Sequence, residues 1–119
     1  TTLIGLMLKA SGFSPFVGGN LGTSLITAIE NENEYDFIVA ELSSYQLEQI
    51  RSLTPRVAVF TTIAQDHLDR YGSMDKYVAA KQRLLELSNS KTLVVMNRDS
   101  LYLNRMGNEP FVSERKRRR

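Results

Sequence analysis

Two positions of this sequence carry side chains that could hold a metal ion. Glu41 lies near the end of an otherwise apolar run at residues 37–42, and His67, the only histidine, is flanked by Asp66 and Asp69. Magnesium prefers hard oxygen ligands, usually one or two carboxylates together with substrate phosphates. Composition alone favours plainer roles, a solvated strand end for Glu41 and a surface side chain for His67. The metal-site hypothesis therefore depends on the rest of the sequence.

Lys81 is a third residue that could act chemically. It lies four residues after Tyr77, on the apolar stripe of a helix that we expect to run from Ser73 to about Leu87. The stripe consists of Met74, Tyr77, Val78, Leu84 and Leu85. The simpler interpretation is a lysine whose stem follows the apolar face while its amine reaches water. The alternative is an amine in a restricted site, where burial disfavours the ammonium ion and leaves the nitrogen reactive.

Two polar segments could contact a ligand. Residues 18–22 read Gly-Gly-Asn-Leu-Gly, a loop whose backbone N–H groups could approach a phosphate or a sugar. A tight turn without any ligand explains the same glycines. Ser43, Ser44 and Gln46 could point polar groups at such a ligand, or the serines could simply cap a helix.

Alternating strands and helices must position these residues. We expect a short strand that runs into the glycine-rich loop within residues 16–22, and further strands near residues 37–42, 57–62 and 92–96. Helices are expected over residues 1–11, 23–30, 43–53 and 73–87. This alternation predicts an α/β fold with a mostly parallel sheet and helices on both faces. In such sheets ligands bind at the carboxyl ends of the strands, where Glu41 and His67 would both lie. Residues 64–72 are expected to form a polar loop, and beyond Asp99 only a short strand at 111–112 is suggested.

Length and composition narrow the class of protein. The 119 residues suffice for one domain, which we place at residues 1–112, followed by a basic tail at 113–119. The sequence has no cysteine, which fits a reducing cytoplasm, and no apolar run long enough to cross a membrane.

The distribution of charge argues against a nucleic-acid binder. Five of the basic residues occupy positions 115–119, and the remainder of the chain is mildly acidic. A nucleic-acid or membrane patch in the tail is disfavoured because no aromatic residues interleave with it.

Four segments together resemble the Mur ligase family in order and spacing. They are Gly-Gly-Asn-Leu-Gly at 18–22, Glu-Leu-Ser-Ser-Tyr-Gln-Leu-Glu at 41–48, Asp-His-Leu-Asp-Arg-Tyr-Gly at 66–72 and Tyr-Val-Ala-Ala-Lys at 77–81. The first two look most like the MurD branch, and the likeness covers residues 1–100. The resemblance implies a central ATP-handling domain of a cytoplasmic, monomeric ligase of peptidoglycan synthesis. That enzyme would join D-glutamate to UDP-N-acetylmuramoyl-L-alanine through an acyl phosphate.

The resemblance also implies roles for single residues. Glu41 and His67 match positions that hold Mg²⁺, and Lys81 matches a lysine carried as a carbamate, which would bind a second Mg²⁺. Lys81 and His67 would be the catalytic residues, with ATP and Mg²⁺ as the cofactors. Asn20, Ser43 and Gln46 match positions around the UDP-muramoyl substrate.

The family's phosphate loop, a glycine-rich run ending in Gly-Lys-Thr or Gly-Lys-Ser, does not occur in these residues. The resemblance places it just before Thr1 and adds a UDP-binding and a glutamate-binding domain, so we expect a fragment that is inactive alone. Two alternatives are another Mur-type ligase and a non-catalytic remnant that binds a nucleotide sugar. The joint presence of Glu41, His67 and Lys81 favours an enzyme, because a pure binder has no need of the lysine.

Overall fold

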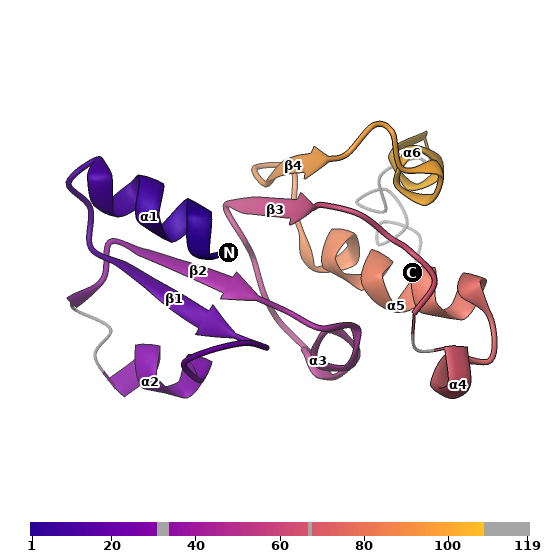
Figure 1. Ribbon diagram of the computed structural model, residues 1–119, viewed down its shortest axis with the longest axis horizontal. Helices are drawn as coiled ribbons and strands as arrows, with labels where there is room; N and C mark the ends of the chain where they lie inside the picture. The colour runs from indigo at the N-terminus through magenta and orange to yellow at the C-terminus, as the bar shows by residue number, and fades with distance from the viewer. Residues whose placement is uncertain (31–33, 67, 109–119) are drawn as a thin grey trace. The chain divides into compact units, whose positions relative to one another are not determined.

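The computed structural model describes residues 1–30, 34–66 and 68–108 (Figure 1). The chain forms two compact units, residues 1–43 (unit 1) and the residues from 44 onward (unit 2). The helices are α1 (Thr2–Ala10), α2 (Leu25–Glu30), α3 (Ser44–Gln49), α4 (Leu68–Tyr71), α5 (Met74–Leu87) and α6 (Leu101–Asn108). The strands are β1 (Pro15–Gly19), β2 (Phe37–Glu41), β3 (Val57–Phe60) and β4 (Leu93–Met96). Within these ranges no helix has the length and apolar character that crossing a membrane requires.

Unit 1 is a parallel pair of strands with a helix on each side. β1 and β2 pair in register from Pro15 opposite Phe37 to Gly19 opposite Glu41. Figure 1 shows α1 and α2 on opposite sides of this pair. Gly5 is the buried residue of α1, and a Cβ atom there would lie only 2.3 Å from the Cγ2 atom of Val17. The missing side chain therefore lets α1 pack closely on β1.

Unit 2 contains the second parallel pair and the larger core. β3 and β4 pair with Val57 opposite Leu93. One face of the pair, which includes Ala58 and Phe60, packs into a core formed with α5 and α6, where Leu103 is fully buried. The opposite face is exposed and apolar, and consists of Val57, Val59, Leu93 and Val95. Among the described helices of this unit, α5 and α6 therefore cover one face of the pair.

Helix α5 forms as the sequence predicts. The hydroxyl oxygen of Ser73 accepts a hydrogen bond from the backbone N–H of Lys76, and Asp75 lies in the first turn, where the helix dipole favours a carboxylate. Tyr77 and Leu85 are buried, and the other members of the expected stripe are partly buried. The apolar stripe is thus confirmed as the face that packs on the core.

The α/β class and the parallel pairing are confirmed, with differences in detail. The strands form two two-stranded sheets, β1 with β2 and β3 with β4. Helix α3 ends at Gln49, short of the expected residue 53. The expected loop 64–72 contains α4, and α6 follows Asp99 where the pattern was weak. The strand expected at 111–112 and the basic tail lie outside the described residues.

Candidate functional site

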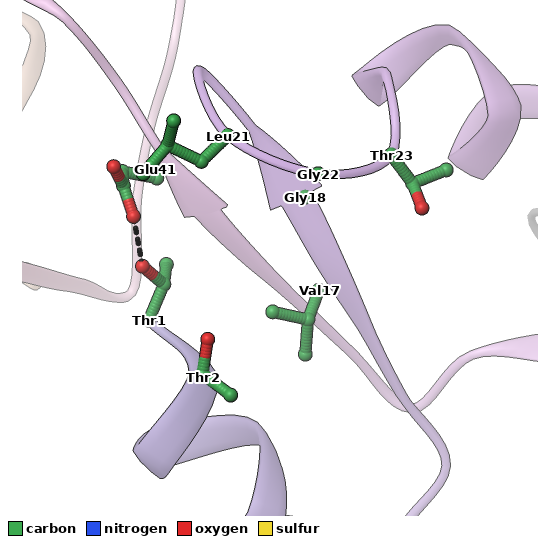
Figure 2. Close-up of a pocket in the computed structure, with 8 residues that line it drawn as sticks. All are labelled: Thr1, Thr2, Val17, Gly18, Leu21, Gly22, Thr23 and Glu41. Carbon is green, nitrogen blue, oxygen red and sulfur yellow. Dashed lines mark hydrogen bonds between the residues drawn. The ribbon is translucent and has the colours of Figure 1, made fainter.

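A pocket of about 230 Å³ in unit 1 contains the carboxylate of Glu41 (Figure 2). It is lined by Thr1, Thr2, Val17, Gly18, Leu21, Gly22, Thr23 and Glu41. Glu41 is half-buried at the carboxyl end of β2, and its carboxylate accepts a hydrogen bond from the hydroxyl group of Thr1. The parallel register explains this position, because it places Glu41 opposite Gly19, where β1 runs into the glycine loop.

The glycine loop is shaped by close backbone contacts. The N–H group of Asn20 donates to the carbonyl oxygen of Glu41 at 2.7 Å, and that of Gly19 donates to the carbonyl oxygen of Thr23 at 2.9 Å. Gly19 has φ 121°, and a Cβ atom there would lie 2.2 Å from the carbonyl oxygen of Glu41. A Cβ atom on Gly18 would lie 2.2 Å from the carbonyl oxygen of Thr23. Both glycines are thus required by the backbone itself, before any ligand is considered.

The groups around this pocket fit a hard cation. Glu41 offers carboxylate oxygens, and Figure 2 shows the hydroxyl group of Thr1 facing that carboxylate. Thr2 and Thr23 also line the pocket, together with the apolar residues Val17 and Leu21. Within residues 1–30, 34–66 and 68–108, no three side chains of His, Cys, Asp or Glu are grouped closely enough to hold a metal ion. A cation beside Glu41 would therefore need water or phosphate oxygens from a ligand, which is the usual way that proteins bind magnesium.

Lys81 lies on α5, in unit 2. Its side chain is half-buried, and its amine lies 5.0 Å from the centre of the Tyr77 ring. At this distance an ammonium ion is attracted by the electron-rich ring face. Tyr77 and Ala80 on the same helix are buried in the core. This position is compatible both with a lysine at the edge of an apolar face and with a restricted, reactive amine.

Two arginine residues that the sequence analysis did not single out connect helices within unit 2. Arg70 on α4 lies 4.3 Å from the centre of the Tyr45 ring and forms an ion pair with Glu48 at 3.0 Å, so it joins α4 to α3. Arg83 on α5 donates hydrogen bonds to backbone carbonyl oxygens at the end of α3. Tyr45 and Glu48 lie in the motif segment at residues 41–48, and Arg70 lies in the one at residues 66–72. Membership of these segments was the only signal in the sequence that could have pointed to the contact of Arg70 with α3.

The expected site residues are described to different extents. Asn20 is bonded through its backbone to Glu41, and its side chain is exposed. Ser43 and Gln46 are partly buried, the first just before α3 and the second on it. His67 lies outside the described residues, and the convergence of Glu41, His67 and Lys81 on one spot stays a prediction.

Comparison with known proteins gives one consistent result. A family model described as the Mur ligase middle domain matches residues 1–115. The chain is 42% identical over 121 aligned positions to the UDP-N-acetylmuramoylalanine--D-glutamate ligase of Syntrophotalea carbinolica, covering 97% of this chain and 27% of that protein. It is 46% identical over 99 positions to the protein of the same name from Geobacter metallireducens, covering 83% and 22%. The chain thus spans about a quarter of the length of the curated relatives it matches.

Proposed function

This chain belongs to the Mur ligase family, and from that premise we propose that it is part of the ATP-handling domain of a ligase that joins D-glutamate to UDP-N-acetylmuramoyl-L-alanine. The names of the relatives support this substrate pair. The structural observation that carries the proposal is the presence of Glu41 in a pocket that the glycine loop also lines. We further propose that the enzyme acts in the cytoplasm as a monomer, as the family resemblance implies.

The proposed reaction has two steps. A carboxylate oxygen of the L-alanine residue attacks the γ-phosphorus of ATP, so that an acyl phosphate forms and ADP leaves. The amine of D-glutamate then attacks the acyl carbon. Phosphate leaves with the C–O bond electrons, the amide forms and the amine loses a proton. Catalysis of such a phosphoryl transfer depends mainly on positioning and on neutralising charge.

In this proposal Glu41, His67 and Lys81 hold magnesium, which when bound would neutralise charge on the transferred phosphoryl group. Lys81 would do so as a carbamate, formed when its neutral amine attacks carbon dioxide, makes a C–N bond and releases a proton. The carbamate replaces a half-buried cation with oxygen atoms suited to the metal. Asn20, Ser43 and Gln46 would bind and orient the UDP-muramoyl substrate.

A hybrid ligase tests the proposal. The segment of the Geobacter metallireducens relative that matches this chain would be replaced by the corresponding residues of this chain. We expect the hybrid to form product and release ADP only when D-glutamate, ATP and the UDP-linked precursor are all present. Glu41→Ala should abolish the reaction, whereas Glu30→Ala, an exposed carboxylate at the end of α2, should not. A hybrid that folds but forms no amide would overturn the proposal.

The carbamate is tested in the same hybrid. Lys81→Ala should abolish ligation while the circular dichroism spectrum stays unchanged, and a short added carboxylic acid such as formate should restore part of the rate. Lys76→Ala is the matched control, because Lys76 is exposed on the same helix. Near-normal activity of Lys81→Ala would mean that the lysine has no part in the reaction.

A further inference from the structure

Arg83 makes three polar contacts within unit 2. Its Nε atom donates to the carbonyl oxygen of Leu47 at 3.0 Å, and its Nη2 atom donates to the carbonyl oxygen of Ile50 at 2.7 Å. Its Nη1 atom lies 3.3 Å from the carboxylate of Glu86, one turn further along α5. The two bonds to carbonyl oxygens are partly buried, and the side chain of Arg83 is 35% exposed.

These carbonyl groups lie at the C-terminal end of α3, where a helix runs out of N–H partners. Helix α3 has only six residues and no basic residue in its last turn, so nothing within it complements that end. The guanidinium group supplies both charge-assisted hydrogen bonds and a positive charge where the helix dipole favours one. A helix this short is not stable by itself and depends on such tertiary contacts.

The contact fixes α3 against α5, and each of the two helices carries a residue of the proposed ligase site. Gln46 lies on α3, between Ser44 and Leu47, which are both buried. Lys81 lies on α5, two residues before Arg83. We propose that Arg83 is a positioning residue, which holds α3 on α5 and so fixes Gln46 relative to Lys81. This inference rests on the proposed function and adds to it a residue that touches neither substrate nor metal.

The planar guanidinium group is essential to this role. Its fork reaches two carbonyl oxygens at once, whereas a lysine ammonium is a point charge on a flexible stem and cannot hold the same pair in a fixed geometry. The ion pair between Arg83 and Glu86 does not join α3 to α5, because both of its residues lie on α5. Its side chains are partly exposed, so it also contributes little to stability.

The experiment compares three variants of the hybrid ligase by steady-state kinetics. Arg83→Ala should raise KM for the UDP-linked precursor about tenfold or more, as loss of charge-assisted hydrogen bonds predicts, with KM for ATP nearly unchanged. Added guanidinium ion at millimolar concentration should lower the KM of Arg83→Ala part of the way back to that of the parent hybrid. Arg83→Lys should show nearly the same raised KM as Arg83→Ala. Glu86→Gln, the matched control, should have the KM of the parent hybrid.

A second measurement uses the 119-residue chain and does not depend on activity. Arg51 is exposed just beyond the end of α3, so trypsin cleavage after Arg51 should become faster in Arg83→Ala and Arg83→Lys but not in Glu86→Gln. Should Arg83→Ala fail to fold, Arg83→Lys supplies both readouts. Unchanged KM values with unchanged cleavage would overturn the role of Arg83 and leave the proposed function intact. An inactive parent hybrid would instead overturn the proposed function, and trypsin cleavage would still decide whether Arg83 holds α3.

Discussion

Tyr71 is a residue whose ring is well packed but whose hydroxyl group is not satisfied. The hydroxyl oxygen is buried and has no hydrogen-bond partner in the part of the chain that the structure describes. Its ring lies 6.1 Å from that of Tyr45 and 5.4 Å from that of Tyr77. Because a buried hydroxyl without a partner costs about 1–3 kcal/mol, Tyr71→Phe should leave the free energy of unfolding unchanged or raise it. Urea denaturation of the hybrid ligase measures this.

The control for Tyr71→Phe is Tyr71→Leu, which removes the ring as well. It should lower the free energy of unfolding by roughly 1–3 kcal/mol, since aromatic contacts and buried area are both lost. If Tyr71→Phe were as destabilising as Tyr71→Leu, the hydroxyl group would have to be bonded in the folded protein.

Among single residues, the sequence points to some candidates and not to others. Glu41 is a candidate because it is a carboxylate near the end of an apolar run, and Lys81 because it interrupts a helical stripe. The role of each stays a prediction. Arg83 could not be found, because its partners are backbone carbonyl groups 33 and 36 positions earlier in the chain. Neither hydrophobic periodicity nor residue type encodes a contact of this kind.

Among the helices and strands, α5 offers the clearest test of whether a local sequence signal, the capping residue Ser73, stabilises the element that it predicts. The hydroxyl group of Ser73 accepts the N–H of Lys76 at 3.3 Å, and this satisfies one of the free donors at the start of the helix. Ser73→Ala should therefore lower the free energy of unfolding by about 0.5–2 kcal/mol. Chemical denaturation checks the value, and Ser73→Asp, which keeps an acceptor oxygen in place, should lose much less. Equal losses in both variants would show that the cap contributes nothing.

The elements that the sequence did not predict are short or weakly patterned. Helix α4 has four residues, which is a single turn and too short to show a periodic pattern. Helix α6 has eight residues and buries Leu103 and Met106, three positions apart on one face. That spacing was present in the sequence, but two apolar residues are too few to separate a helix from a loop.

For the 119 residues as a whole, one feature of the sequence leads to a clear expectation. No Gly-Lys-Thr or Gly-Lys-Ser sequence occurs in the 119 residues, so the backbone cradle and lysine that bind ATP phosphates are not among them. The 119-residue chain should release no phosphate from ATP above background, with or without magnesium and the UDP-linked precursor. Robust magnesium-dependent turnover by the purified chain would contradict this, and the hybrid ligase is the positive control.

The whole fold was predictable in class and only partly in arrangement. Apolar strands that alternate with amphipathic helices predict parallel pairing, and both strand pairs are parallel. Which strands become neighbours was not predictable, because strand order depends on contacts between distant segments that leave no trace in a single strand's pattern. The exposed apolar face of β3 and β4 likewise looks the same in the sequence as a covered face.

Among the described strands, β3 pairs only with β4 and therefore along only one of its two edges. This has a consequence for the exchange of its backbone amide hydrogens with deuterium. The N–H groups of Leu93 and Asn97 donate to Arg56 and Phe60, so alternate residues of β3 direct their backbone groups at β4. The amides of Val57 and Val59 point to the other edge, where no described strand pairs with β3. In deuterated water these two amides should exchange fast while those of Leu93 and Asn97 stay protected. Uniformly slow exchange along β3 would instead reveal that its second edge is covered, so two amides report on whether this strand is central or peripheral.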